Sequence, residues 1–398
     1  MEQRNISLYK LIFVFLKCGT IGFGGYLALV SLIERQVVDK YKWCSKSDIL
    51  DALAFASVMP GPLAVNSAAF IAYRCAGLLG AILATAGLIF PSFLLMIIIG
   101  ANYQSIQVND IGTKLLYGFS AATAGIVGAM VISVSRSQIK KVSDLILAII
   151  CLLLMHFVKG VFGTVSCITI ATLVGILLSK SDQTLDVSHN TQVKIRDIFI
   201  LIVTVLLGVS FTLIPVSSAP LVLMQQLWTT MCSLSLMMFG GGYVAIPIFK
   251  SALVDQHAWI TLEVFSHAIS LGQITPGPVM ITATFIGYVV LGIAGAIIST
   301  IAMFSPTAIL MIFAANFHSA ASKIKFLVSI ISSFRVAAVG MISAALLFLS
   351  IQLMSAQNVN NLMGLFFALI TCLLSLRYKN LSVGILILVS GLSMIIFT

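Results

Sequence analysis

The sequence Val-Met-Pro-Gly-Pro-Leu-Ala-Val-Asn-Ser occupies residues 58–67, and Ile-Thr-Pro-Gly-Pro-Val-Met-Ile-Thr occupies residues 274–282. Both segments place Pro-Gly-Pro inside a hydrophobic stretch, where proline and glycine each disfavour a continuous helix. The two tripeptides are 216 residues apart, because 276 − 60 = 216. A pair of helix breaks at matching positions predicts a binding site that is built at the breaks.

The similarity extends well beyond the two tripeptides. Further identical segments coincide at the shift of 216 or at a shift of 215, and they are Phe23-Gly24-Gly25 with Phe239-Gly240-Gly241, Trp43 with Trp259, Phe70-Ile71 with Phe285-Ile286, and Pro91 with Pro306. Self-similarity of this kind indicates two copies of one unit. We therefore expect a first transporter repeat at residues 1–180, a linker with an additional transmembrane helix at 181–220, and a second repeat at 221–398.

The composition indicates a polytopic membrane protein. Hydrophobic residues make up 60% of the chain and charged residues only 9%, whereas a soluble domain carries about 25% charged residues. Because open sheet edges are excluded from lipid and the alternating pattern of a membrane barrel is absent, we expect an all-α fold. With about 20 apolar residues per crossing, the predicted spans are 8–30, 49–72, 77–100, 114–134, 143–158, 161–179, 197–215, 226–249, 264–288, 292–315, 326–351, 361–376 and 381–397.

The span predicted between the repeats would start the second repeat on the opposite side of the membrane. The repeats are then inverted, as in many secondary transporters. With the amino terminus in the cytoplasm, cytoplasmic segments carry fourteen Lys and Arg residues and outer segments carry six, in line with the positive-inside rule. Re-entrant Pro-Gly-Pro hairpins would give twelve against eight, so this alternative stays open.

Several function classes lack support in the sequence. The net charge of +10 is scattered over short loops and follows the predicted topology, so no nucleic-acid partner is expected. The seven cysteines and five histidines show neither CxxC pairs nor metal-ligand spacing, which predicts no metal and no cofactor. Motifs of enzyme active sites are also absent, and we therefore expect no enzymatic activity.

The helix breaks carry the chemistry that points to a function. A half-helix that begins after a break presents unpaired N–H groups and a partial positive charge, and both favour an anion. The substrate-binding residues that we predict at and beside the breaks are Gly24, Gly25, Pro60, Gly61, Pro62, Asn66, Ser67, Gly240, Gly241, Gln273, Thr275, Pro276, Gly277, Pro278 and Thr282. The open alternatives are that hydroxyl groups bond to their own helix and that glycines allow ordinary close packing.

Charged residues within or near the spans complete the predicted pathway. Lys17 and Arg335 lie inside spans, where a cation is costly and is usually functional, so they are predicted counter-charges for the anion. Snorkelling of Lys17 to the interface is the alternative. For proton coupling, the predicted groups near span ends are Glu34, Asp51 and Glu263.

Several of these segments together resemble the chromate transporter family in its long, fused form. They are Phe15-Leu16-Lys17-Cys18-Gly19, Phe23-Gly24-Gly25, Val58-Met59-Pro60-Gly61-Pro62, Phe239-Gly240-Gly241-Gly242-Tyr243 and Gly272-Gln273-Ile274-Thr275-Pro276-Gly277-Pro278. The resemblance implies a transporter of the cytoplasmic membrane that exports chromate by means of the proton gradient. A passive anion channel, a transporter for sulfate-type oxyanions and a homodimeric assembly stay open.

Overall fold

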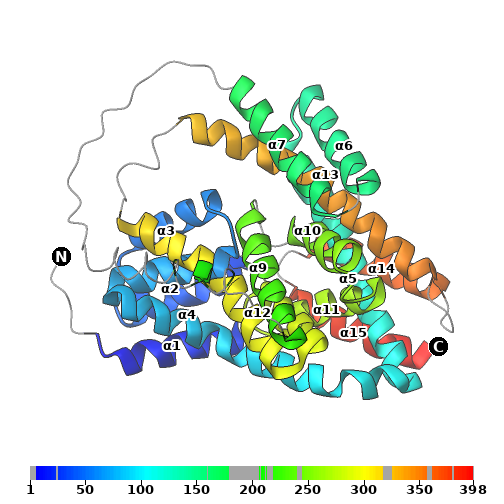
Figure 1. Cartoon of the computed structure of the whole chain (residues 1–398), viewed down its shortest axis with the longest axis horizontal. Helices are drawn as coiled ribbons and strands as arrows, with labels where there is room; N and C mark the ends of the chain where they lie inside the picture. Colours follow the sequence, from blue (N-terminus) through cyan, green and yellow to red (C-terminus); the bar gives the residue numbers. More distant parts are fainter. Residues whose placement is uncertain are drawn as a thin grey trace. The chain divides into compact units, whose positions relative to one another are not determined.

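The structure is a computed structural model of the 398-residue chain. It describes residues 6–23, 26–158, 160–178, 206, 208–210, 212, 218–239, 244–316, 325–355, 361–378 and 381–397. Within these ranges all regular structure is helical and no strand occurs (Figure 1). The all-α prediction is confirmed for this part of the chain.

The described helices occupy the hydrophobic stretches predicted as spans, but α4 and α12 each contain the end of one predicted span and the whole of the next, with non-helical residues at Ala76–Gly77 and Leu291–Gly292 between them. In chain order they are α1 (Leu8–Ile21), α2 (Tyr26–Glu34), η1 (Arg35–Lys40), α3 (Lys46–Val58), α4 (Leu63–Val108), α5 (Asp110–Gln138), α6 (Val142–Phe157), α7 (Val161–Leu178), α9 (Ala219–Met237), α10 (Ala245–Lys250), η3 (Ser251–Gln256), α11 (Leu262–Ile274), η4 (Val279–Ile281), α12 (Thr282–Asn316), α13 (Lys325–Ser355), α14 (Asn361–Arg377) and α15 (Val383–Phe397). The span predicted at 197–215 lies almost entirely outside the described residues.

Four described segments are long and apolar enough to cross a membrane, namely Leu63–Val108, Asp110–Gln138, Val279–Ala315 and Ser332–Ser355. Shorter apolar helices accompany them, including Val142–Phe157 and Val383–Phe397. These helices support a multi-pass membrane protein. The number of crossings and the inverted orientation of the repeats stay predictions.

The spans predicted at 8–30 and 226–249 are each interrupted, which corrects the expectation of continuous helices there. Helix α1 ends at Ile21 and α2 begins at Tyr26, whereas α9 ends at Met237 and α10 begins at Ala245. Both endings use the same tight turn, because Phe23 N–H donates to Ile21 O over 3.0 Å and Phe239 N–H donates to Met237 O over 3.1 Å. The glycine runs after these turns favour such a break over a continued helix.

The internal repeat is visible in the backbone. A six-residue π-helical turn occurs at Arg35–Lys40 and again at Ser251–Gln256, 216 residues later. Positive φ angles follow at matching residues, 52° at Lys42 and 49° at Ala258. These features lie outside the Pro-Gly-Pro segments, so the duplication covers the local conformation as well as the sequence.

The chain forms two compact units, and each unit contains segments of both repeats. Unit 1 comprises Met1–Ile97, Ser181–Gly241 and Pro276–Lys325, and unit 2 comprises Ile98–Lys180, Gly242–Thr275 and Phe326–Thr398. The compact units therefore do not follow the boundaries predicted for the repeats. The repeats defined by sequence similarity and the compact units of the structure therefore have different boundaries in this chain.

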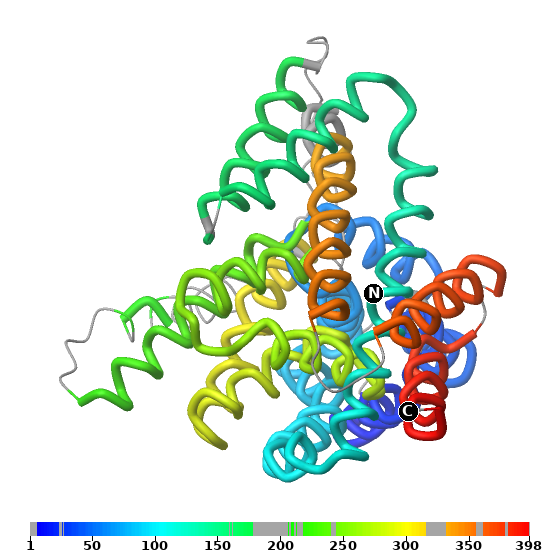
Figure 2. The backbone as a smooth tube through the Cα atoms, turned by 90° about the vertical axis from the view of Figure 1, so that its right-hand side faces the viewer, coloured from blue at the N-terminus to red at the C-terminus, as the bar shows by residue number. Residues whose placement is uncertain are grey.

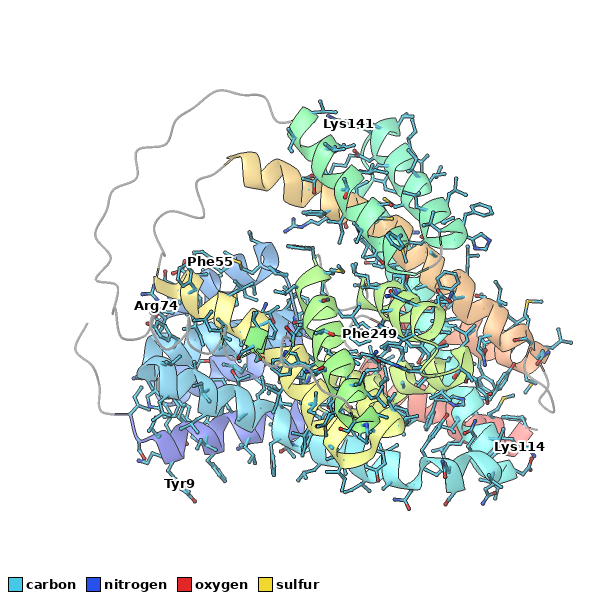
Figure 3. The ribbon with its side chains drawn as sticks, viewed as in Figure 1. Tyr9, Phe55, Arg74, Lys114, Lys141 and Phe249 are labelled. Atoms are coloured by element: carbon cyan, nitrogen blue, oxygen red, sulfur yellow. The ribbon has the colours of Figure 1, made fainter. Side chains whose placement is uncertain are left out.

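In unit 1, α12 packs along α9, and α1 packs against α4 (Figure 1). Phe55 on α3 and Arg74 on α4, both labelled in Figure 3, pack on the ring of Phe70. Phe55 stacks on this ring with centroids 5.5 Å apart, and the guanidinium of Arg74 lies 5.7 Å from its centroid. Arg74 also approaches Asp48, whose carboxylate caps α3 by accepting from Ser45 N–H. The entry to the first break is thus fixed by packing and by a capping box.

In unit 2, α5 is the central helix, with α14, α15 and α11 packed against it. Helices α6 and α7 lie side by side in both views (Figures 1 and 2). Small residues allow α15 to approach α5 closely, because a Cβ atom on Gly118 would lie 2.7 Å from the Cα of Gly391. Ser390 Oγ donates to Gly118 O over 3.1 Å at this contact. Unit 2 therefore depends on close backbone contact, as membrane helices commonly do.

Replacing Gly118 with alanine is expected to destabilise the protein by about 1–3 kcal/mol, because the methyl group forces α15 away from α5. Gly128→Ala on the same helix is the control. Its new Cβ would meet nothing closer than Cys372 Sγ at 3.6 Å, so stability should stay equal or rise. Thermal unfolding of the detergent-solubilised protein measures both effects, and equal midpoints for the two variants would contradict the role of this contact.

Candidate functional site

Two broken helices lie at the centre of the candidate site, and their Pro-Gly-Pro segments have matching conformations. Helix α3 ends at Val58 and α4 begins at Leu63, with Gly61 between them at φ +103°. Helix α11 ends at Ile274, and Gly277 follows at φ +98° before η4 and α12. The break predicted at each Pro-Gly-Pro is therefore confirmed, and a positive φ explains the need for glycine there.

The two breaks are joined to the opposite repeats by crossed hydrogen bonds within unit 1. Gly61 N–H donates to Met238 O over 2.7 Å, and Gly277 N–H donates to Gly22 O over 2.9 Å. Met238 and Gly22 occupy matching positions, because 238 − 216 = 22, and both directly follow the interrupted helices α9 and α1. Each repeat thus supplies the carbonyl that accepts the hydrogen bond from the glycine N–H at the break of the other repeat.

A second pair of residues at matching positions of the repeats packs against the two glycines. A Cβ atom on Gly61 would lie 2.5 Å from side-chain atoms of Thr307, and one on Gly277 would lie 2.9 Å from Ser92 Oγ. Thr307 and Ser92 follow the prolines Pro306 and Pro91 in α12 and α4. Sequence reasoning did not select these two hydroxyl residues, although the shift of 215 relates them and would have identified them as a pair.

Polar side chains next to the first break are fully buried and only partly satisfied. Asn66 and Ser67 are each 0% exposed in the first turns of α4. Asn66 Nδ2 donates to Pro60 O over 2.7 Å, and its second N–H has no acceptor among the described residues. Asn66 Oδ1 and Ser67 Oγ have no hydrogen-bond partner among the described residues. Because buried polar atoms normally have partners, unpaired ones beside a break indicate a place for a polar ligand or water.

At the second break most hydroxyl groups bond to nearby carbonyls. Thr282 Oγ1 donates to Val279 O, and Thr275 Oγ1 donates to Gly272 O over 3.2 Å. Gln273 differs, because neither side-chain amide atom has a partner in the described part of the chain. The alternative that hydroxyls bond to their own helix therefore fits Thr275 and Thr282, whereas Ser67 and Gln273 keep free polar atoms.

The predicted cations lie in different compact units. Lys17 is exposed on α1 in unit 1, and Arg335 is exposed on α13 in unit 2. Among the described residues no Asp or Glu side chain forms an ion pair with Lys17. That the two cations act at one anion site stays a prediction.

The other predicted residues are placed as follows. Gly24, Gly25, Gly240 and Gly241 lie outside the described residues. Of the predicted proton-coupling groups, Glu34 and Asp51 are half-buried, and Glu263 is exposed in the first turn of α11. Within the described ranges no group of three or more His, Cys, Asp and Glu side chains is placed to hold a metal ion.

In the comparison with known proteins, one family model matches the chain twice. The family model described as chromate transporter matches residues 9–179 and again residues 225–395. No solved structure matches the chain.

Full-length relatives are similar over both halves. The chromate transport protein of Cupriavidus metallidurans is 26% identical over 94% of this chain and 90% of its own length. The probable chromate transport protein of Synechococcus elongatus is 28% identical over 98% of this chain and 96% of its own length. An uncharacterized transporter of Methanocaldococcus jannaschii is 30% identical over 78% of this chain and 77% of its own length. The chain belongs to the chromate transporter family, a family of transporters and not of enzymes, as a long member with both repeats fused in one polypeptide.

Proposed function

We propose that this protein is a secondary active transporter that exports chromate across the cytoplasmic membrane, driven by the proton gradient, with its amino terminus in the cytoplasm. The observation that carries the proposal is the crossed pair of hydrogen bonds at Gly61 and Gly277, which joins the two Pro-Gly-Pro segments to the opposite repeats within unit 1. The names of two full-length relatives support chromate as the substrate.

A divalent oxyanion suits the groups beside the first break. The half-helix that begins at Leu63 contributes its first N–H groups and the positive end of its dipole. The Ser67 hydroxyl and the second N–H of Asn66 add donors that have no partner among the described residues. In the low dielectric of a membrane protein, hydrogen bonds from such donors to a charged acceptor are strong.

Lys17 supplies the positive charge in unit 1. Its helix, α1, leads directly to Gly22, whose carbonyl accepts from the second break. A cation within an apolar helix is costly unless it serves transport, and its lack of an acidic partner in the described part of the chain leaves the charge available for an anion.

The crossed hydrogen bonds also bear on the transport movement. Moving one whole repeat against the other would break both bonds and leave two amide groups unpaired at the breaks. We therefore propose that unit 1 carries its bound anion as one body, with both breaks kept intact.

Transport of labelled chromate into inside-out vesicles tests the function. We expect accumulation against the concentration gradient when a proton gradient is imposed, and its loss when an uncoupler is added. Excess sulfate measures selectivity. Uptake that is only downhill would favour a passive anion channel, and complete inhibition by sulfate would favour a broader oxyanion transporter.

Ser67→Ala tests the binding site in the same vesicles. Loss of one hydrogen bond to a charged ligand costs about 1.5–3 kcal/mol, so the KM for chromate should rise roughly tenfold or more. The unfolding temperature should not fall, because Ser67 Oγ has no partner to lose within the described protein. Ser375→Ala is the matched control, since that hydroxyl is also buried and has no partner among the described residues but lies on α14 in unit 2. An unchanged KM in Ser67→Ala would remove this residue from the site.

A further inference from the structure

A line of polar side chains runs along one side of α11 in unit 2. It begins at the exposed Glu263, continues through the buried His267 and Ser270, and ends at Gln273, three residues before Pro276. The spacing of four, three and three residues keeps these side chains on the same side of a helix. With a rise of 1.5 Å per residue, the line is about 15 Å long.

His267 is the titratable group at the buried part of this line. It is 4% exposed, and its Nδ1 shares a hydrogen bond of 2.7 Å with Tyr103 Oη. The two rings meet edge to face with centroids 6.0 Å apart. Tyr103 is itself 4% exposed and lies in the last turns of α4, which belong to unit 2. Among the described residues no partner reaches the second ring nitrogen, Nε2.

Hydroxyl groups continue the line beyond His267. Thr123 Oγ1 on α5 donates to Ser270 Oγ over 2.9 Å, and Ser270 Oγ donates to Ser266 O. Ser266 Oγ and Ser120 Oγ are buried and have no partner within the described ranges. Unpaired buried hydroxyls are uncommon, and hydroxyl groups on the helix that carries His267 and on the neighbouring α5 suit bound water and proton movement.

Few other charged groups lie on the elements that pack against α11. These elements are α5, α15 and α10. Helix α5 carries the titratable residues Asp110, Lys114, Tyr117 and Arg136, α10 carries Lys250, and α15 carries none. Besides His267 itself, α11 adds Glu263, and the last turns of α4 add Tyr103. Asp110 pairs with Lys114, and Lys250 pairs with Asp255. Of these described titratable groups, Tyr103 is the one that hydrogen-bonds to the imidazole of His267, and Glu263 lies one turn away on α11.

The repeat adds an independent observation. His267 matches Asp51, because 267 − 216 = 51, so the same position of the first repeat also carries a titratable residue. Asp51 lies on α3, the half-helix before the first break, as His267 lies on α11, the half-helix before the second break. A titratable side chain at this position is therefore a shared feature of both repeats.

We propose that His267 carries the coupled proton of transport, with Tyr103 as its positioning residue and the polar line along α11 as its path. The inference rests on the proposed function, because it names the group that links the gradient to chromate movement. In the step itself, one nitrogen lone pair of the neutral imidazole takes up one proton to give imidazolium. The same proton is later released, so no electrons are exchanged. Tyr103 Oη can accept the hydrogen bond that Nδ1–H then donates.

The test compares three assays in proteoliposomes that contain the full chain. They are accumulation of labelled chromate driven by an imposed proton gradient, chromate counterflow at equal pH on both sides, and chromate-linked proton flux followed with a pH-sensitive dye. We expect His267→Gln to keep counterflow but to lose gradient-driven accumulation and proton flux. We expect Tyr103→Phe to keep accumulation but to shift the pH at which accumulation is half-maximal, because the imidazole loses the hydrogen bond that positions it. Replacement of His156, an exposed histidine on α6, by glutamine should change none of the three assays.

The outcomes separate this assignment from the proposed function. Wild-type protein without gradient-driven accumulation overturns the proposed function and this assignment with it. Wild-type accumulation that persists in His267→Gln overturns only the assignment. Loss of counterflow in both His267→Gln and His267→Asn also overturns it, because His267 then acts in folding or in chromate binding.

Discussion

Gly61→Ala is expected to abolish chromate transport and to destabilise the protein. The added methyl group would lie 2.5 Å from Thr307 side-chain atoms, and the backbone at φ +103° disfavours any L-amino acid. Strain of this kind costs about 1–3 kcal/mol and the collision costs about 1–3 kcal/mol more. Relief of the collision moves Gly61 away from Met238 and breaks the hydrogen bond between the repeats. Vesicle uptake and thermal unfolding measure the two effects.

Gly77→Ala is the matched control for this prediction. Gly77 also has a positive φ, +69°, but a Cβ atom there would meet nothing within 4 Å. This variant should therefore lose stability through strain alone, about 1–3 kcal/mol, and should keep transport. Gly277 and Gly292 form the same pair of crowded and open glycines in the second repeat. Equal transport by Gly61→Ala and Gly77→Ala would show that the contact with Thr307 is not needed.

The second large effect is expected for Asn66→Leu. Leucine has a similar size but cannot donate to Pro60 O, which accepts from Asn66 Nδ2 over 2.7 Å. An unpaired carbonyl at a buried break costs about 1–3 kcal/mol, and the start of α4 loses the group that fixes it to the break. Transport should fall to the background level of empty vesicles, because the donors of Ser67 and of the half-helix move with that turn.

Asn102→Leu provides the comparison. Like Asn66, Asn102 donates to a backbone carbonyl through Nδ2. Its acceptor is Ile98 O in the same helix, over 2.8 Å, and its side chain is exposed. Its loss should leave transport unchanged and should cost less than about 1.5 kcal/mol, the upper end for an ordinary net hydrogen bond. If Asn66→Leu unfolds no earlier than Asn102→Leu and still transports chromate, Asn66 is neither a brace for the break nor a part of the site.

The sequence predicted the helical class, the position of the described helices and the breaks at both Pro-Gly-Pro segments. These features are local, because hydrophobic length, proline and glycine act within a few residues of the chain. The repeat added long-range information, since Gly61 and Gly277 had to share one conformation. Their φ angles of +103° and +98° confirm this.

Three features could not be predicted from single residues. The interruptions after Ile21 and Met237 were missed because hydrophobic length alone favours one continuous span there. The acceptors of the crossed hydrogen bonds, Met238 O and Gly22 O, are backbone atoms without a side-chain signature. The two compact units mix the repeats, and no local pattern in the sequence marks a boundary such as Ile97.

The pair of Tyr103 and His267 shows the same limit for side chains. The residues are 164 positions apart, and each alone has an ordinary sequence neighbourhood. His267 did not match any metal-ligand spacing, and the sequence favoured Glu34, Asp51 and Glu263 for proton coupling because they lie near the ends of predicted spans. Only packing of α11 in unit 2 places a buried imidazole next to a phenol.

The crossed hydrogen bonds impose an order of events during synthesis of the protein. The acceptor for Gly61 leaves the ribosome 177 residues later, because 238 − 61 = 177, and the donor for Gly22 follows after 255 residues, because 277 − 22 = 255. At about 5–20 residues per second, the first repeat spends roughly 9–35 s in the membrane with its break incomplete. The first half cannot complete its break until Met238 has been made, so membrane chaperones and quality-control proteases encounter it as an unfinished substrate in every round of translation.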